Sequence, residues 1–198
     1  LEEGSPNLRL KKSMELGPFE GAISMGSRKL NARFSYNKRF GAVSERSKRG
    51  SWTRALHPDY TLTFWPEGVS EVIAEREELL VHIHFDAKYK IENIEGLFGL
   101  DGSDDVDEEV EGNYKRQDLL KMHAYRDAIK RSQGAFILYP GRSVQPTRFT
   151  GFHEILPGLG AFGVSPDESG NAQGIDDLSN FLNESLKHLC NRATSRER

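Results

Sequence analysis

Several features that would define a function class are missing from this 198-residue sequence. Cys190 is the only cysteine, so the chain cannot form an internal disulfide or a cysteine-rich zinc site. This cysteine usage fits a reducing compartment, and we expect a cytoplasmic location. No apolar run approaches the length of a membrane span, which argues against a membrane partner. The glycines at 158 and 160 are not followed by Lys-Ser or Lys-Thr, so they do not predict a nucleotide-binding P-loop.

The sequence also lacks an overall excess of positive charge, because its formal net charge is -3. The charges are nevertheless segregated along the chain. Residues 101–111 hold seven acids and no base, and removing these acids from the net charge leaves +4. Residues 1–50 hold eleven Lys or Arg against five acids. This segregation suits a surface that faces phosphates better than the average charge suggests, although each single charge is also explained by solvation.

The length predicts one domain with a hydrophobic core. We expect an N-terminal segment at 1–28, a folded domain at 29–190 and a C-terminal tail at 191–198. The chain begins with Leu1 rather than with a start methionine, so we expect that an upstream part is missing. The acidic segment 101–112 has almost nothing to bury, which predicts a mobile loop inside the domain.

Hydrophobic periodicity predicts a mixed α/β sheet with helices packed on it. The region from Glu78 to Tyr89 alternates most clearly, with His82, His84 and Asp86 on one side of a strand. The expected strands are 29–36, 55–65, 78–89, 135–139 and 160–164, and the expected helices are 114–132 and 175–190. A helix that crosses over between strands implies parallel neighbours in the sheet.

Two short motifs lie at the ends of adjacent predicted strands. Pro58-Asp59 opens one strand, and Asp86-Ala87-Lys88 ends the next. If the two strands are neighbours, both carboxylates and the Lys88 amine converge on one face. Two carboxylates can hold Mg²⁺, and a nearby lysine can orient water or stabilise charge on phosphorus. The motifs alone fit this phosphodiester chemistry and a solvated ion pair about equally well.

The predicted helix 114–132 shifts that balance. Lys121 and Tyr125 are spaced i, i+4 and share a helix face, with Asp118 one turn earlier. The Pro-Asp and Asp-x-Lys motifs together with this helix resemble the nuclease domain of McrC-like proteins in the PD-(D/E)XK superfamily. The resemblance runs in order from about residue 30 to residue 189, and the helix motif is its most specific part.

The resemblance implies a restriction-endonuclease-like fold, a mixed β-sheet flanked by helices. It implies that Asp59 and Asp86 bind Mg²⁺ or Mn²⁺, with the Ala87 carbonyl as a third ligand, and that Lys88 is the catalytic lysine. Lys121 and Tyr125 match the place of a Gln-x-x-x-Tyr pair in related nucleases, so the resemblance gives them a catalytic role. The implied function is hydrolysis of double-stranded DNA in restriction or antiviral defence. A nucleotide-driven motor subunit or an additional domain is the implied partner.

Alternatives remain open at this stage. Related nucleases often add a glutamate from a helix before the first strand, and Glu15 and Glu20 are poor candidates for it. The chain could therefore be an inactive DNA-binding or assembly module on a nuclease fold. We expect His82 and His84 to be packed rather than to bind metal, and Trp52 and Trp65 to be core or hairpin residues. We expect RNA as a substrate least of all.

Overall fold

The computed structural model of the chain describes residues 16–25, 28–42, 50–88, 111–140, 147–149 and 158–196. Within these ranges a seven-stranded sheet has the order β1-β2-β5-β6-β7-β9-β8. Its strands are β1 (Leu16–Met25), β2 (Arg28–Tyr36), β5 (Tyr60–Pro66), β6 (Val81–Ala87), β7 (Ser132–Tyr139), β8 (Thr147–Phe149) and β9 (Leu159–Gly163).

Three helices and two small strand pairs complete the described part of the chain. The helices are α1 (Glu71–Arg76), α3 (Glu111–Ala128) and α4 (Ile175–Arg196). The short strands are β3 (Gly41–Ala42), β4 (Gly50–Ser51), β10 (Ser165–Pro166) and β11 (Ala172–Gln173). Among the described helices, none has the length and apolarity needed to cross a membrane.

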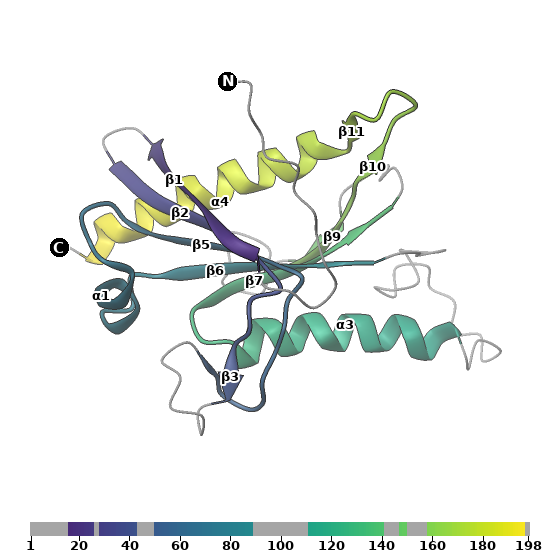
Figure 1. The fold of residues 1–198 in the computed structure, drawn as a ribbon, viewed down its shortest axis with the longest axis horizontal. Helices are drawn as coiled ribbons and strands as arrows, with labels where there is room; N and C mark the ends of the chain where they lie inside the picture. Colours follow the sequence, from purple (N-terminus) through teal and green to yellow (C-terminus); the bar gives the residue numbers. More distant parts are fainter. Residues whose placement is uncertain are drawn as a thin grey trace.

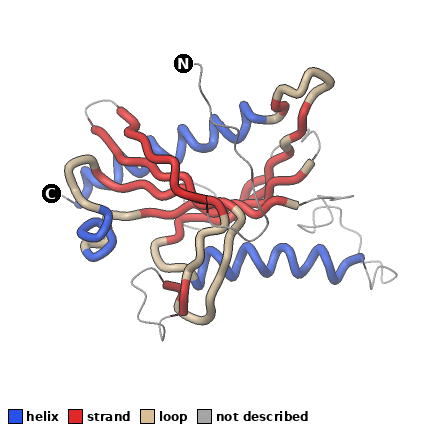
Figure 2. The backbone as a smooth tube through the Cα atoms, viewed as in Figure 1, coloured by secondary structure: helices blue, strands red, loops and turns tan. Residues whose placement is uncertain are grey.

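The two long helices cover opposite faces of the sheet, α4 on one side and α3 on the other (Figure 1). Figure 2 shows the strands as the layer between them. Strands β1, β2, β5 and β6 are antiparallel neighbours, whereas β6, β7 and β9 run parallel. Helix α3 connects β6 to its parallel neighbour β7, as a crossover requires. The predicted mixed α/β sheet flanked by helices is therefore confirmed.

The alternation predicted for β6 decides what each face of the sheet contains. Ile83 and Phe85 join the aromatic core under α4, where the tilted rings of Phe136 and Phe181 have centroids 4.6 Å apart. His82, His84 and Asp86 point to the α3 side and are all buried. The core on that side is built around α3, with Met122, Tyr125, Ile129 and their neighbours. The predicted Asp-x-Lys motif thus lies on the polar face of a strand whose other face is apolar.

Some element boundaries differ from the sequence-based expectation. Strand β1 lies within the predicted N-terminal segment, where Gly17-Pro18 hid the pattern, and it pairs antiparallel with β2. The six-residue helix α1 lies between β5 and β6, where no helix was expected, and Ser70 caps it by accepting a hydrogen bond from the Ile73 backbone N–H. Helix α3 occupies 111–128 rather than 114–132. Helix α4 continues to residue 196, so most of the predicted C-terminal tail is helical.

The two tryptophans differ from each other. Trp65 is buried beside α1, as expected, and donates its indole N–H to the Val69 carbonyl at 3.1 Å. Trp52 is 61% exposed, so the expectation that it packs in the core or in a hairpin is wrong. The predicted mobile loop 101–112 lies outside the described residues, apart from its last two positions at the start of α3.

Candidate active site

Asp59 and Asp86 meet where β5 begins and β6 ends. Tyr60 pairs with Phe85 in the antiparallel register of these strands, which sets Asp59 opposite Asp86. The Asp59 Oδ2 atom accepts a hydrogen bond from the Ala87 backbone N–H at 2.8 Å. The structure therefore brings together the two carboxylates that the sequence places 27 positions apart.

Asp86 is the buried centre of the cluster, with 1% of its surface exposed. Its Oδ1 atom lies 2.6 Å from the Lys121 ammonium, and its Oδ2 atom lies 2.8 Å from the Lys88 ammonium. Among the described residues, no donor makes a well-aligned hydrogen bond to Oδ2, although Lys88 is at ion-pair distance. A metal ion bound to Asp86 would therefore compete with these two ammonium groups for its oxygens.

Lys88 is held between two carboxylates. Besides Asp86, its ammonium group contacts Asp118 on α3 at 2.5 Å. Burial by itself would lower the pKa of Lys88, but the contacts with Asp118 and Asp86 outweigh burial and raise it. The sequence predicted a site role for Lys88 but assigned none to Asp118. The spacing of Asp118 from Lys121 and Tyr125, one and two helix turns, was the signal that could have identified it.

Tyr125 connects α3 to the segment that precedes Asp59. Its hydroxyl donates to the His57 carbonyl at 2.9 Å and, over a longer 3.4 Å, to the Asp86 Oδ1 atom. Burial, followed by the negative charges of Asp86 and Asp59, raises the pKa of Tyr125 well above its usual value. The hydroxyl therefore stays protonated and remains a hydrogen-bond donor. The Lys121 ammonium lies 5.5 Å from the centre of the Tyr125 ring, so both predicted helix residues face the site.

The electrostatics of the carboxylate pair favour a bound cation. Burial and the neighbouring charge of Asp86 raise the pKa of Asp59, more than its hydrogen bond to Ala87 and the nearby lysines lower it. Two carboxylates and the adjacent Ala87 carbonyl match the oxygen ligands that Mg²⁺ prefers while it keeps several waters. Within the described residues, no group of three or more His, Cys, Asp or Glu side chains is placed to hold a metal ion. A cation here would therefore rely on two carboxylates, a carbonyl and water.

A buried polar row continues from Asp86 along the same face of the sheet. The Nδ1 atom of His84 lies 3.1 Å from the Thr61 hydroxyl, and that of His82 lies 2.9 Å from the Thr63 hydroxyl. Both imidazoles contact the Phe40 ring edge to face. Burial and, second, the charge of Lys38 lower the pKa of His84 to about 3, so this ring is neutral. As predicted, both histidines are packed.

The two glutamates considered as additional metal ligands are not part of this cluster. Glu20 lies on β1 and pairs with Arg33 at 2.6 Å, so it does not complete the carboxylate pair. Glu15 lies outside the described residues.

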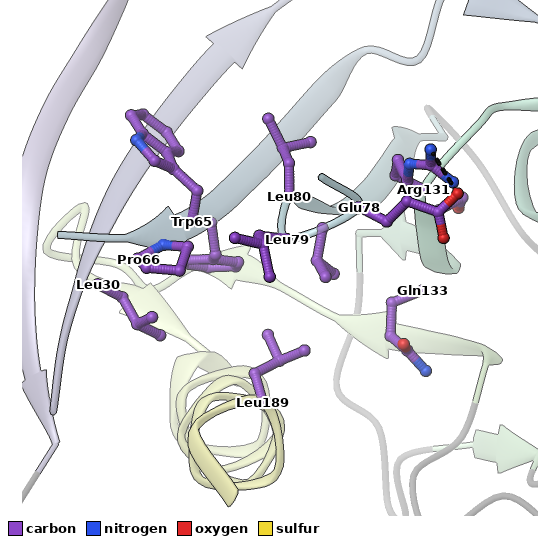
Figure 3. A pocket seen from close by; sticks show the side chains of 12 residues that line it. Leu30, Trp65, Pro66, Glu78, Leu79, Leu80, Arg131, Gln133 and Leu189 are labelled. Atoms are coloured by element: carbon purple, nitrogen blue, oxygen red, sulfur yellow. Dashed lines mark ion pairs between the residues drawn. The ribbon is translucent and has the colours of Figure 1, made fainter. Parts of the chain in front are cut away.

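An apolar pocket of about 260 Å³ lies at the other end of β6, beside Val81 and Leu189 (Figure 3). An ion pair between Glu78 and Arg131, 3.0 Å long, marks its polar end. None of the residues that line this pocket belongs to the carboxylate cluster. The pocket is therefore separate from the candidate active site.

Comparison with known proteins gives one finding on the family. A family model described as the PD-(D/E)XK nuclease superfamily matches residues 4–144. This range contains Asp59, Asp86, Lys88 and all of α3. No match was found among curated proteins or among solved structures.

Proposed function

Because the chain belongs to the PD-(D/E)XK nuclease superfamily, we propose that it is a metal-dependent endonuclease that hydrolyses DNA phosphodiester bonds. The observation that carries the proposal is the convergence of Asp59 and Asp86 beside Lys88, fixed by the bond from the Ala87 N–H to Asp59. This arrangement has the acidic pair and the amine that phosphodiester hydrolysis requires, on two adjacent strand ends.

Asp59, Asp86 and the Ala87 carbonyl are the groups that would hold Mg²⁺ or Mn²⁺. A bound dication would polarise a phosphate oxygen and lower the pKa of a coordinated water. The observation that supports this ligand set is the position of the two carboxylates on adjacent strand ends, beside the Ala87 backbone. Asp59, Asp86 and Asp118 against Lys88 and Lys121 leave one net negative formal charge, which attracts a cation before the phosphate arrives.

The chain's own residues then orient and stabilise the phosphate. Lys88 is fixed by Asp86 and Asp118, so its ammonium can face the charge that develops on phosphorus without first losing rotamer freedom. Lys121 is 40% exposed in its side chain and contacts Asp86 from α3, so it can turn to a phosphate oxygen. Tyr125 holds the backbone at His57 in place, which keeps Asp59 opposite Asp86.

The finer parts of the proposal rest on the resemblance described above. We propose a role in restriction or antiviral defence in the cytoplasm, on double-stranded DNA. A nucleotide-driven motor would come from a partner subunit or an additional domain. The match to the superfamily does not separate McrC-like nucleases from other members, so that likeness remains a prediction.

One observation favours a second candidate, a DNA-binding or assembly module without catalysis. Both oxygens of Asp86 already lie within ion-pair distance of a lysine, and Glu20 is engaged by Arg33 instead of joining the pair. A cation must compete with two ammonium groups for Asp86. Weak metal binding would leave the fold intact and the chemistry absent.

Plasmid cleavage separates the two candidates. The protein is incubated with supercoiled DNA and Mg²⁺ or Mn²⁺, and Asp86→Asn is compared with Asp176→Asn, an exposed position at the start of α4. We expect cleavage by the wild type and by Asp176→Asn. For Asp86→Asn we expect a loss on the order of a thousandfold, the effect of several kcal/mol of metal-assisted stabilisation.

Mn²⁺ binding measured by calorimetry on the same proteins gives a second readout. Loss of Mn²⁺ binding in Asp86→Asn alone would support the ligand set. Equal cleavage by Asp86→Asn and the wild type would remove Asp86 from the mechanism. DNA binding by the wild type without cleavage, at saturating Mn²⁺, would favour the binding module.

A further inference from the structure

Trp52 is an exposed indole in a segment that leads directly to the candidate active site. It is 61% exposed, whereas Trp65 is 6% exposed. An indole in water forgoes the burial that makes tryptophan stabilising, and its exposed ring is available to a flat ligand. The segment from Trp52 to Asp59 also contains His57, whose carbonyl binds Tyr125.

The backbone around Trp52 is anchored. The Trp52 N–H donates to the Ala128 carbonyl at 2.7 Å, and the Lys130 N–H donates to the Gly50 carbonyl at 3.2 Å. Ser51 is fully buried and forms an isolated bridge with Ile129. The indole is therefore presented to solvent from a fixed base at the end of α3, which reduces the entropy cost of binding a flat ligand.

One cation lies against the ring, and a second acts on the carboxylate cluster. The Lys130 ammonium lies 4.3 Å from the Trp52 ring centroid and covers one face of the indole. Arg54 is exposed two residues further along the chain, and its positive charge acts on the Tyr125 hydroxyl, so it lies within electrostatic reach of the carboxylate cluster. Positive charge is thus supplied by Lys130 at the ring, by Arg54 in the segment that leads to Asp59 and by Lys121 on α3. This charge complements a polyanion better than a neutral or basic partner.

The number of residues between Trp52 and Asp59 sets an upper limit on their separation. Trp52 precedes Asp59 by seven positions along the chain, and a fully extended chain advances at most roughly 3.6 Å per residue. Trp52 therefore lies within about 25 Å of Asp59, or about seven base steps of a strand that rises roughly 3.4 Å per nucleotide. A strand with its scissile phosphate at Asp86 can reach the indole.

We propose that Trp52 stacks on an unpaired base of the bound DNA, with Lys130 and Arg54 contacting the flanking phosphates. The proposal rests on the proposed function for the position of the DNA. In a duplex both faces of every internal base are covered by neighbouring bases, so only an unpaired or flipped base offers a face to the indole. The preferred substrate is then duplex DNA that carries an unpaired stretch within about seven nucleotides of the cleaved bond.

Intrinsic fluorescence of the full chain tests this stacking without metal or cleavage. The two tryptophans respond differently, because the exposed Trp52 is accessible to a base and the buried Trp65 serves as an internal reference. The probes are a 20-nucleotide single strand, the matching duplex, and a duplex with a single-stranded overhang. We expect saturable quenching by the single strand and by the overhang, and little quenching by the blunt duplex.

Trp52→Ala should remove the quenching and weaken single-strand binding by roughly five- to 150-fold, the range expected when one stacked base is removed. Trp52→Phe keeps an aromatic face and should restore most of the affinity, which a merely structural role would not predict. Lys130→Ala and Arg54→Ala should each make binding less sensitive to salt. Each should reduce the slope of log affinity against log salt by about 0.7, the value for one phosphate on a single strand.

The outcomes distinguish this proposal from the proposed function. Cleavage of DNA by both the wild type and Trp52→Ala, with equal single-strand affinity, would overturn the stacking and leave the nuclease intact. Quenching that depends on Trp52 in a protein that cannot cleave would support the stacking and count against the nuclease. Equal weakening of single-strand and duplex binding by Trp52→Ala would also overturn the stacking. The stacking would likewise be overturned if Trp52→Ala changed the oligomeric state and left DNA binding unchanged, because Trp52 would then be a protein contact.

Discussion

Toward α4, strand β6 presents Ile83 and Phe85, which pack among the rings of Phe136, Phe162 and Phe181. Toward α3, the same strand presents His82, His84 and Asp86, each buried beside another polar or charged group. The two faces belong to the same strand, and the side chains on both are buried. They differ only in which residues of the alternating sequence they receive.

The difference shows how the fold divides stability and chemistry. Aromatic packing on the α4 face supplies hydrophobic free energy without any polar group to satisfy. The α3 face buries an acid, two histidines and a lysine, whose ion pairs and hydrogen bonds offset part of the desolvation energy that they cost. The hydrophobic free energy of the α4 face can offset the cost of burying polar groups on the α3 face. Those polar groups can then take part in catalysis. The following substitutions test this division.

The largest expected effect is on stability and comes from the α4 face. Phe181→Ala removes a ring that is 1% exposed and lies 4.6 Å from Phe136 between centroids. We expect unfolding in urea to become easier by about 3–5 kcal/mol, the usual cost of a large cavity. Ile175→Ala on the same helix, 46% exposed, is the matched control and should change stability by less than about 0.5 kcal/mol. Mn²⁺ binding by folded Phe181→Ala should match the wild type; a loss there would mean that the faces are coupled.

The second effect is pH dependence from the α3 face. Burial holds the pKa of His84 at about 3 in the folded protein, whereas an unfolded histidine has a pKa near 6.5. Below about pH 6.5 the unfolded chain binds a proton at His84, whereas the folded chain does not. The free energy of unfolding therefore falls as the pH falls from about 6.5 toward 3. The free energy of unfolding is then about 2 kcal/mol lower at pH 5 than at pH 7 because of His84.

Urea unfolding at pH 7 and at pH 5 measures this contribution. Between pH 7 and pH 5, the free energy of unfolding of His84→Gln should fall by about 2 kcal/mol less than that of the wild type. His123→Gln, at an exposed position on α3, is the control and should keep the wild-type difference. An unchanged difference in His84→Gln would show that His84 does not control the acid sensitivity.

A smaller effect concerns the position of Lys88. Asp118→Asn keeps the shape of the side chain but removes one of the two carboxylates that hold the ammonium. We expect cleavage to slow about tenfold, equivalent to about 1.4 kcal/mol, near the low end for a hydrogen bond to a charged group. Asp118→Glu should recover part of the rate. Asp127→Asn, on the same helix but outside the cluster, should cleave like the wild type, and an equal loss in both variants would point to a general effect of helix charge.

The smallest effect is expected at Tyr125. Tyr125→Phe removes the hydroxyl that donates to the His57 carbonyl at 2.9 Å, but it keeps the ring in the core. Thermal unfolding should report a loss of about 1 kcal/mol, which corresponds to a shift of roughly 2–4 °C for a domain of this size. A loss above about 3 kcal/mol would mean that the long contact with Asp86 matters more than its 3.4 Å suggests.

Much of the fold followed from local patterns. The strict alternation in β6 predicted which residues share a face, and the helical spacing of Asp118, Lys121 and Tyr125 predicted a common helix side. Strand β1 was missed because Gly17-Pro18 masks its pattern and because it gains its hydrogen bonds from pairing with β2. Helix α1 was missed because six residues carry almost no periodicity, and the Ser70 cap is its clearest local signal.

Most residues of the site were predictable from the sequence, but the contacts between them were not. Lys88, Lys121 and Tyr125 were identified by position in their motifs, and the structure brings all three to Asp86. Asp118 received no role, because its contact with Lys88 depends on how α3 lies across the sheet. The exposure of Trp52 was predicted wrongly, since composition alone favours burial of tryptophan.

By itself, the order of residues determined that Asp86 and Lys88 share a face of β6 and that the opposite face is apolar, because side chains alternate along any strand. Only the tertiary structure decided that Asp59 lies opposite Asp86, that Asp118 closes on Lys88 and that Trp52 remains in solvent. Those contacts depend on strand register and on the packing of α3, which involve residues distant along the chain and leave no repeat in the sequence.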